Sequence, residues 1–170
     1  MAKRKINPLF QPFIHDNLDL KNELVQLARW AIDDESVEKR LSAVLIYSNI
    51  AEYLVEHLLD SLNHCIYENS YKNFGGILFL SSASWTSYGT IWTLIGELKK
   101  FTFPDKEEII KCLEKIVKAR NKIFHNFAKT DIETIGDLLS KDLPTIATET
   151  ETLITKTNTI YASLQKIIQS

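Results

Sequence analysis

The chain has 170 residues, of which 45% are hydrophobic and 25% charged, a composition typical of one soluble globular domain with a real core. Its net charge of −2 excludes strong non-specific binding to nucleic acid by the molecule as a whole. Any contact with RNA or DNA must therefore come from a local basic patch.

The two cysteines, Cys65 and Cys112, lie far apart in the sequence, and each falls within a helical pattern. This spacing fits neither a disulfide framework nor a zinc site, so we expect two buried thiols in a reducing compartment. The basic N-terminus lacks the apolar core of a signal peptide, and no window approaches the roughly 20 apolar residues of a membrane span. We expect a cytoplasmic protein that does not bind a membrane.

The first part of the chain predicts an extended arm and two helices. Pro8 and Pro12 favour an extended arm over residues 1–15, and the apolar spacing after it predicts a helix that begins at Asp16 or Asn17. A second helix is predicted to begin within residues 33–36. Its apolar series alternates steps of four and three, which predicts the central helix of the fold: Val37, Leu41, Val44, Ser48, Ala51, Val55, Leu58 and Leu62.

Residues 67–76 contain Asn, Ser and two adjacent glycines and form the clearest predicted break. The segment 77–89 that follows fits either a short helix or irregular structure. A third helix is predicted over residues 90–101 and a turn over residues 103–105. The helix after that turn has apolar positions that lead into residues 118–129.

The last segment begins at Asp131, and Pro144 is expected to kink its helix or to start a new one. From Leu139 an apolar series again alternates four and three, as in a long helix that lies along the bundle or against a second subunit. Thr150 and Thr157 fall on this stripe, so we expect looser packing there. The sequence predicts an all-α fold: one domain over residues 1–170, built as an up-and-down bundle of five to six helices.

Residues 118–129, KARNKIFHNFAK, place Arg120, Asn121 and His125 near the end of a strongly apolar helix. Asn121 and His125 share a helical face, whereas Arg120 lies about 140° from His125 and would have to reach round with its long side chain. Histidine transfers protons near neutral pH, arginine binds a phosphate through two parallel hydrogen bonds, and asparagine orients either group. The three residue types therefore suit phosphate binding or phosphodiester cleavage.

An arginine and a histidine at this separation arise readily by chance, so the spacing alone is a weak signal. The alternative interpretation is structural. The cations at this helix end would then complement the helix dipole: Lys118, Arg120, Lys122 and His125.

The run RNKIFHN (residues 120–126) resembles the signature of HEPN domains, small helical bundles whose motif is an arginine, four to six residues, and then a histidine. In that family the residue after the arginine is typically Asn, Asp or His, and here it is Asn121. The predicted order of a long central helix, a loop, a third helix, a turn and the motif-bearing helix also resembles the family's layout. The resemblance covers most of residues 33–128, and its specific part is residues 120–126.

The resemblance implies a homodimer in which the two motifs face each other across a cleft. Many HEPN proteins are metal-independent endoribonucleases of toxin–antitoxin, phage-defence or stress-response systems, so the implied partners are RNA and an antitoxin or regulatory protein, with no metal or other cofactor. Arg120, Asn121 and His125 are the implied catalytic residues. The flanking candidates for RNA or phosphate binding are Lys118, Lys122 and Asn126.

One position departs from the family. The toxin branch that pairs with a nucleotidyltransferase often has a tyrosine two residues after the histidine, where this chain has Phe127, so that branch is disfavoured. The alternative function is a non-catalytic helical module for dimerisation or regulation. If the protein is an enzyme, we expect Arg120 and His125 to be partly exposed in an electropositive cleft. If it is a scaffold, we expect them to pair with backbone carbonyls or with carboxylates such as Glu114.

The stretch HLLDSLNH (57–64) places three metal-ligand residue types on one helix face: His57, Asp60 and His64. A solvated face is favoured over a metal site because the neighbouring positions are also polar: Glu52, Glu56 and Asn63. A third alternative is that one polar residue of this helix points toward the Arg120–His125 site.

Trp85, Tyr88 and Trp92 follow one another at three- and four-residue steps. Aromatic residues in such a set can stack nucleic-acid bases, but they more often belong to a core or a dimer interface. We expect core or interface positions for these residues and for Trp30.

Overall fold

The computed structural model describes residues 16–74, 90–127 and 129–169, with side chains described at residues 22–66, 90–127, 129–164 and 166. These residues form α1 (Asp16–Ile32), α2 (Val37–Phe74), α3 (Ile91–Leu98), α4 (Lys106–Phe127) and α5 (Ile132–Gln169). The arm expected at residues 1–15 and the ambiguous segment 77–89, with Trp85 and Tyr88, lie outside the described residues.

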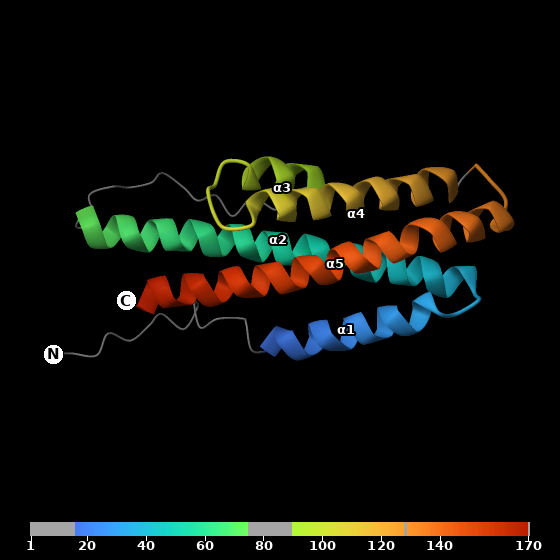
Figure 1. Ribbon diagram of the computed structural model, residues 1–170, viewed down its shortest axis with the longest axis horizontal. Coiled ribbons are helices and arrows are strands. Elements are labelled where there is room, and N and C mark those ends of the chain that lie inside the picture. Colours follow the sequence, from blue (N-terminus) through green and yellow to red (C-terminus); the bar gives the residue numbers. More distant parts are fainter. Residues whose placement is uncertain (1–15, 75–89, 128, 170) are drawn as a thin grey trace.

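α2 is the central helix, as predicted, because it contacts each of the other four described helices. α5 lies beside α2, with α3 and α4 on one side of this pair and α1 on the other (Figure 1). The long helices α1, α2, α4 and α5 run in alternating directions (Figure 1). The predicted all-α, up-and-down bundle is confirmed.

The two predicted apolar stripes form the core where these helices meet. The stripe of α2 is at most 6% exposed at each of its positions from 44 to 62, and the stripe of α5 is at most 3% exposed from 139 to 160. α5 packs against α2 and α4 of its own chain. Its stripe is therefore buried along the bundle and needs no second subunit to cover it.

Side chains at the helix starts accept hydrogen bonds from the first free backbone N–H groups. Ser36 Oγ accepts one from the Lys39 N–H at 3.3 Å, and Asp131 Oδ1 accepts one from the Thr134 N–H at 2.8 Å. The predicted turn at residues 103–105 is also present. There Asp105 adopts a left-handed backbone conformation (φ 59°), which aspartate tolerates better than most residues.

The break predicted at residues 67–76 is wrong over most of its length, because α2 continues to Phe74. Asn and Ser in a helix that is already nucleated and packed cost only about 0.5 kcal/mol each relative to Ala, too little to end it. The helix predicted over residues 90–101 is shorter than expected, since α3 ends at Leu98 and the next residues form turns.

Pro144 does not start a new helix, because α5 runs from Ile132 to Gln169 with this proline inside it. Pro144 lies on the exposed face of α5. There the carbonyl oxygen of Ser140, which loses its usual N–H donor, can be hydrated instead. The lost hydrogen bond therefore does not end the helix.

Cys65 and Cys112 are buried and neither forms a disulfide, as predicted. Burial, followed by a hydrogen bond with Glu149, raises the pKa of the Cys112 thiol to about 12. A thiol with this pKa is a poor nucleophile at neutral pH.

The expectation of core positions is wrong for Trp30 and Trp92, which are 61% and 48% exposed. The Trp30 ring instead lies under the ammonium of Lys39, whose Nζ is 4.6 Å from the ring centroid. A dimer interface at either tryptophan stays a prediction. None of the described helices has the length and apolar character needed to cross a membrane.

Thr150 and Thr157 are fully buried on the α5 stripe, but their hydroxyls differ. Thr157 Oγ1 donates to the carbonyl oxygen of Leu153 at 2.8 Å, whereas Thr150 Oγ1 has no hydrogen-bond partner among the described residues. A buried hydroxyl without a partner keeps its full cost of desolvation.

We therefore expect Thr150→Val to raise the free energy of unfolding by about 1–2 kcal/mol, because it removes the unpaired hydroxyl at nearly constant volume. Thr157→Val is the matched control, and it should not raise stability because it removes a hydrogen-bonded hydroxyl. Urea unfolding followed by circular dichroism measures both. An equal gain in the two variants would contradict the explanation.

Candidate functional site

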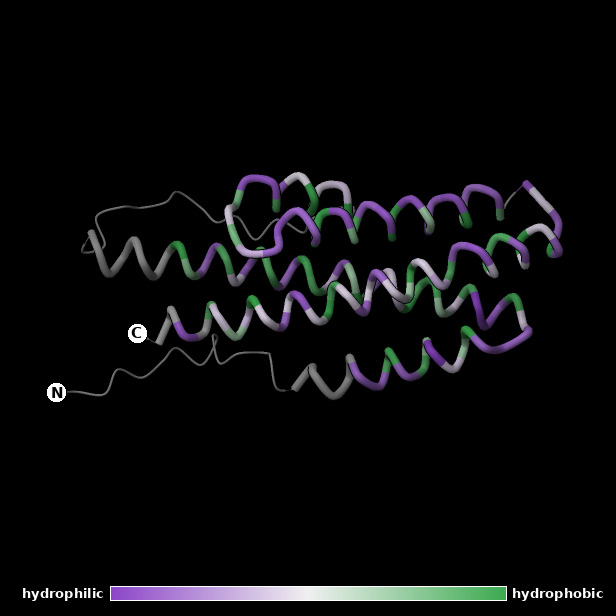
Figure 2. Tube along the Cα trace, in the orientation of Figure 1, coloured by the Kyte–Doolittle hydropathy of each residue, from purple (hydrophilic) through white to green (hydrophobic). Residues whose placement is uncertain are grey.

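Every residue of the candidate motif lies on α4. Most of its apolar residues form one buried face, although Phe127 is 52% exposed, and most of its polar residues lie on the outer side of the helix (Figure 2). Glu107 and Glu108 in the first turn and His125 in the last complement the helix dipole. His125 therefore lies where the structural interpretation of the motif requires a basic residue, whereas Lys118 lies more than two turns from the helix end.

Arg120 reaches across to α2. Its Nη1 donates to Glu52 Oε1 at 2.9 Å, and both side chains are 31% exposed. Among the described residues this is the one hydrogen bond of the guanidinium, which has five N–H donors. The pair joins α2 to α4, and within the described residues the other guanidinium nitrogens have no partner that would keep a ligand from binding.

His125 and Asn121 lie on the exposed side of α4 together with Lys118. Residues 120 and 125 of an α-helix point about 140° apart, and α4 is helical through Phe127. Arg120 is directed toward Glu52 and does not reach round toward His125. Within one chain, the two side chains therefore do not converge on a common point.

Lys122 and Asn126 have structural contacts. Lys122 Nζ lies 2.7 Å from Asp142 Oδ2 of α5, and the Asn126 amide donates to the Lys122 carbonyl oxygen at 2.6 Å. The carbonyl oxygen of Asn126 accepts hydrogen bonds from the N–H groups of Lys129 and Thr130, which closes the end of α4. Asn126 thus stabilises the helix end next to His125.

Glu52 is the site residue that the motif did not reveal. From the sequence, Glu52 was only one of several polar residues of the central helix. The sequence predicted, as one alternative, that some polar residue of this helix points toward the motif, but it did not say which. A helical pattern states which face a residue occupies but not which helix packs there. The predicted carboxylate partner, Glu114, instead lies 3.8 Å from Lys99 Nζ.

Further along α2, Glu56 follows Glu52 at a spacing of one helical turn. Burial raises the pKa of Glu56 above its usual value, and repulsion from Glu52 and Asp60 raises it further. Arg120 is thus bound at one end of a row of carboxylates: Glu52, Glu56 and Asp60.

The metal alternative finds no support in the geometry. His57 packs edge-to-face against the Tyr53 ring at 4.7 Å between centroids, and Asp60 is exposed. In the parts of the chain that the structure describes, no three His, Cys, Asp or Glu residues are grouped so that they could hold a metal ion.

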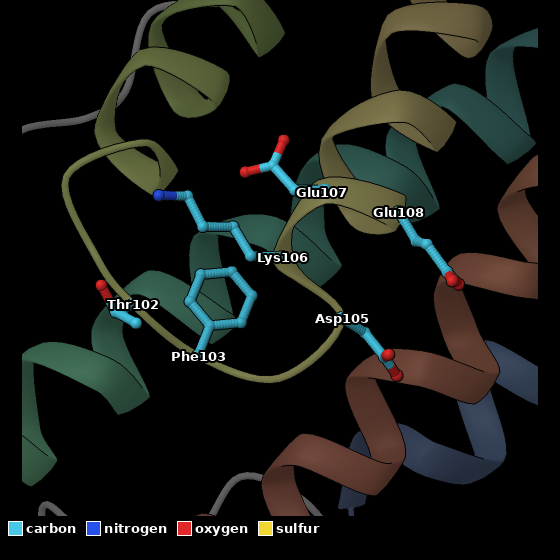
Figure 3. A pocket seen from close by; sticks show the side chains of 6 residues that line it. All are labelled: Thr102, Phe103, Asp105, Lys106, Glu107 and Glu108. Atoms are coloured by element: carbon cyan, nitrogen blue, oxygen red, sulfur yellow. The ribbon is translucent and has the colours of Figure 1, made fainter.

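A pocket of about 450 Å³ lies at the turn between α3 and α4 (Figure 3). Three of the charged side chains that line it are engaged: Lys106 Nζ donates to the Lys99 carbonyl oxygen at 2.8 Å, and Lys156 pairs with Asp105 and Glu108. Lys106 and His125 stand 19 residues apart on α4, about 28 Å along the axis. The pocket is thus separate from the motif.

The chain matches no family model, no curated protein and no solved structure. Its function has to be argued from the residues themselves.

The raised pKa of Glu56 predicts a pH-dependent effect on stability. Because folding raises this pKa, ionised Glu56 opposes folding at neutral pH, and the penalty disappears below about pH 4, where the group is protonated in both states. Glu56→Gln should therefore raise the urea midpoint at neutral pH and lose that advantage as the pH falls. Glu35→Gln, at an exposed carboxylate before α2, is the control. A gain that persisted at pH 3 would show that ionisation is not its cause.

Proposed function

We propose that this chain is a HEPN-like RNA-binding protein that acts as a metal-independent endoribonuclease of a toxin, phage-defence or stress-response type. The observation that carries the proposal is the state of Arg120. Glu52 holds its guanidinium through one nitrogen, and the remaining N–H groups have no hydrogen-bond partner among the described residues, so they can bind a phosphate. The likeness of residues 120–126 to the HEPN signature supplies the reaction class.

The reaction is attack of a ribose 2′-OH on the adjacent phosphorus. A new O2′–P bond forms and the P–O5′ bond breaks, which leaves a 2′,3′-cyclic phosphate and a 5′-OH. A base takes the 2′-OH proton and an acid protonates O5′; we assign this proton handling to His125. Arg120 stabilises the charge on the phosphoryl oxygens, and Asn121 orients His125 or the phosphate.

The proposal includes a homodimer. Arg120 and His125 of one chain leave α4 about 140° apart, so a phosphate held by both needs residues from two copies. A second copy that packed near the C-terminal half of α4 would bring its His125 to the free edge of Arg120. Glu52 acts in this arrangement as a positioning residue that holds the guanidinium.

We expect the purified protein in EDTA to cut mixed single-stranded and structured RNA and to leave DNA of the same sequence intact, because the mechanism uses the 2′-OH. His125→Ala should lower the rate at least about 100-fold, the usual contribution of a general acid or base. Asn158→Ala, an exposed polar residue of α5, is the control and should cut like the wild type. Products are identified by their cyclic phosphate ends.

Cleavage that survives in His125→Ala would mean a contaminating nuclease or a different catalytic residue. Absence of cleavage with every RNA, in a protein shown to be folded by circular dichroism, would exclude the enzymatic proposal and leave the second candidate.

The second candidate is a non-catalytic helical module for dimerisation or regulation. The Arg120–Glu52 pair favours it, since pairing of this arginine to a carboxylate is what a structural role predicts. In that case the Arg120–Glu52 pair joins α2 to α4, and His125 complements the helix dipole at the end of α4. An antitoxin or other regulatory protein is a partner compatible with either candidate.

Arg120→Lys separates the two candidates. Lysine keeps the charge opposite Glu52 but cannot bind a phosphate through two parallel N–H groups. An enzyme should lose most activity in this variant at nearly unchanged stability. If the arginine has a structural role, it should instead contribute to stability. In a double-mutant cycle of the free energy of unfolding, Arg120→Gln and Glu52→Gln should show a coupling energy of about 1–2 kcal/mol, between the values of exposed and buried pairs.

A further inference from the structure

The exposed side of α4 carries cations at a regular helical spacing. Steps of four, three, four and three residues connect them, which keeps all five on one side of the helix: Lys111, Lys115, Lys118, Lys122 and His125. We call this set the lysine stripe. All five side chains are exposed, and the set spans about 21 Å along the helix axis.

Two members of the lysine stripe are neutralised by α5. Lys115 pairs with Glu149, and Lys122 pairs with Asp142. Lys111 and Lys118 have no ion pair within the described residues. They are therefore the members of the stripe without an ion-pair partner in the described part of the chain, and Lys118 lies two helical turns before His125.

The sequence around Lys118 strengthens this local charge, whereas Lys111 has Glu107 and Glu114 within one helical turn. Residues 115–129 contain no Asp or Glu, although the whole chain has a net charge of −2. The stripe is thus the kind of local basic patch that a nearly neutral protein needs in order to bind a polyanion. Its opposite face, the apolar face of α4, is buried in the core.

We infer that the lysine stripe binds the phosphate backbone of single-stranded RNA and leads it along α4 to His125. This inference rests on the proposed function and adds the direction of the bound strand and the residues that hold it. A polyanion with regularly spaced charges complements a straight row of ammonium groups. Single-stranded RNA is the form that fits the reaction, because in-line attack by the 2′-OH requires nucleotides that are free to leave helical stacking.

An anionic membrane is the less suitable occupant. Amphipathic helices that bind membranes insert an apolar face between the headgroups, and the apolar face of α4 is committed to the core. The stripe could therefore attract a membrane only through its charge, without an apolar face to insert.

The test measures binding of a fluorescent single-stranded RNA whose 2′-OH groups are all methylated, so that it keeps its phosphates but cannot be cut. Affinity is measured against salt concentration. The slope of log K against log salt is negative, and each lost phosphate contact reduces its magnitude by about 0.7 for a single strand. Lys111→Ala with Lys118→Ala should therefore reduce the magnitude of the slope by about 1.4 and the affinity in 0.1 M salt about 25-fold.

Lys141→Ala with Lys166→Ala is the matched control, since it removes the same charge from two exposed lysines of α5 that lie outside the stripe and, like Lys111 and Lys118, have no ion pair within the described residues. An equal loss in both double variants would overturn the inference, because the effect would then depend on net charge. If the RNA binds and neither variant matters, the stripe is excluded while the proposed function stands. If the wild type fails to bind RNA but binds vesicles containing phosphatidylserine, or binds neither, both proposals fall.

Discussion

The packing of α2 against α5 is the contact on which the rest of the structure depends. Each helix has an apolar stripe with alternating four- and three-residue steps, and each stripe is almost completely buried. α1 packs on one side of this pair and α4 on the other. Because the buried face of α4 is used for this packing, its polar face is directed outward. The exposure of Asn121, His125 and the lysine stripe follows from that arrangement.

Arg120 connects α4 to the central helix α2. Its backbone lies on the packed side of α4, and its side chain ends at Glu52 of the central helix. A half-buried ion pair adds modest stability, but it fixes the position of a guanidinium better than solvent would. The same contact can therefore serve the bundle and hold a phosphate-binding group. His125 lies in the last turn of α4, next to the Asn126 carbonyl oxygen that closes the helix end.

Much of the fold could be predicted from apolar spacing, because burial of a stripe requires the same period in sequence and in structure. The start of α2, the turn before α4 and the long α5 are examples. The errors occur where a local signal is too weak to end a helix that has already formed. α2 continues through Asn and Ser residues that read as a break, and α5 continues through Pro144 because the carbonyl it leaves unpaired faces solvent.

The sequence by itself determined the helical class, the central role of α2 and the positions of Arg120, Asn121 and His125 on one helix, since these follow from composition and from the geometry of a single helix. Only the tertiary structure decided that Arg120 pairs with Glu52 and that Lys115 and Lys122 are neutralised by α5, while Lys111 and Lys118 have no ion pair in the part of the chain that the structure describes. These contacts join residues far apart in the chain. Their partners depend on how helices pack, and a periodic pattern specifies which face of a helix is buried but not what lies against it.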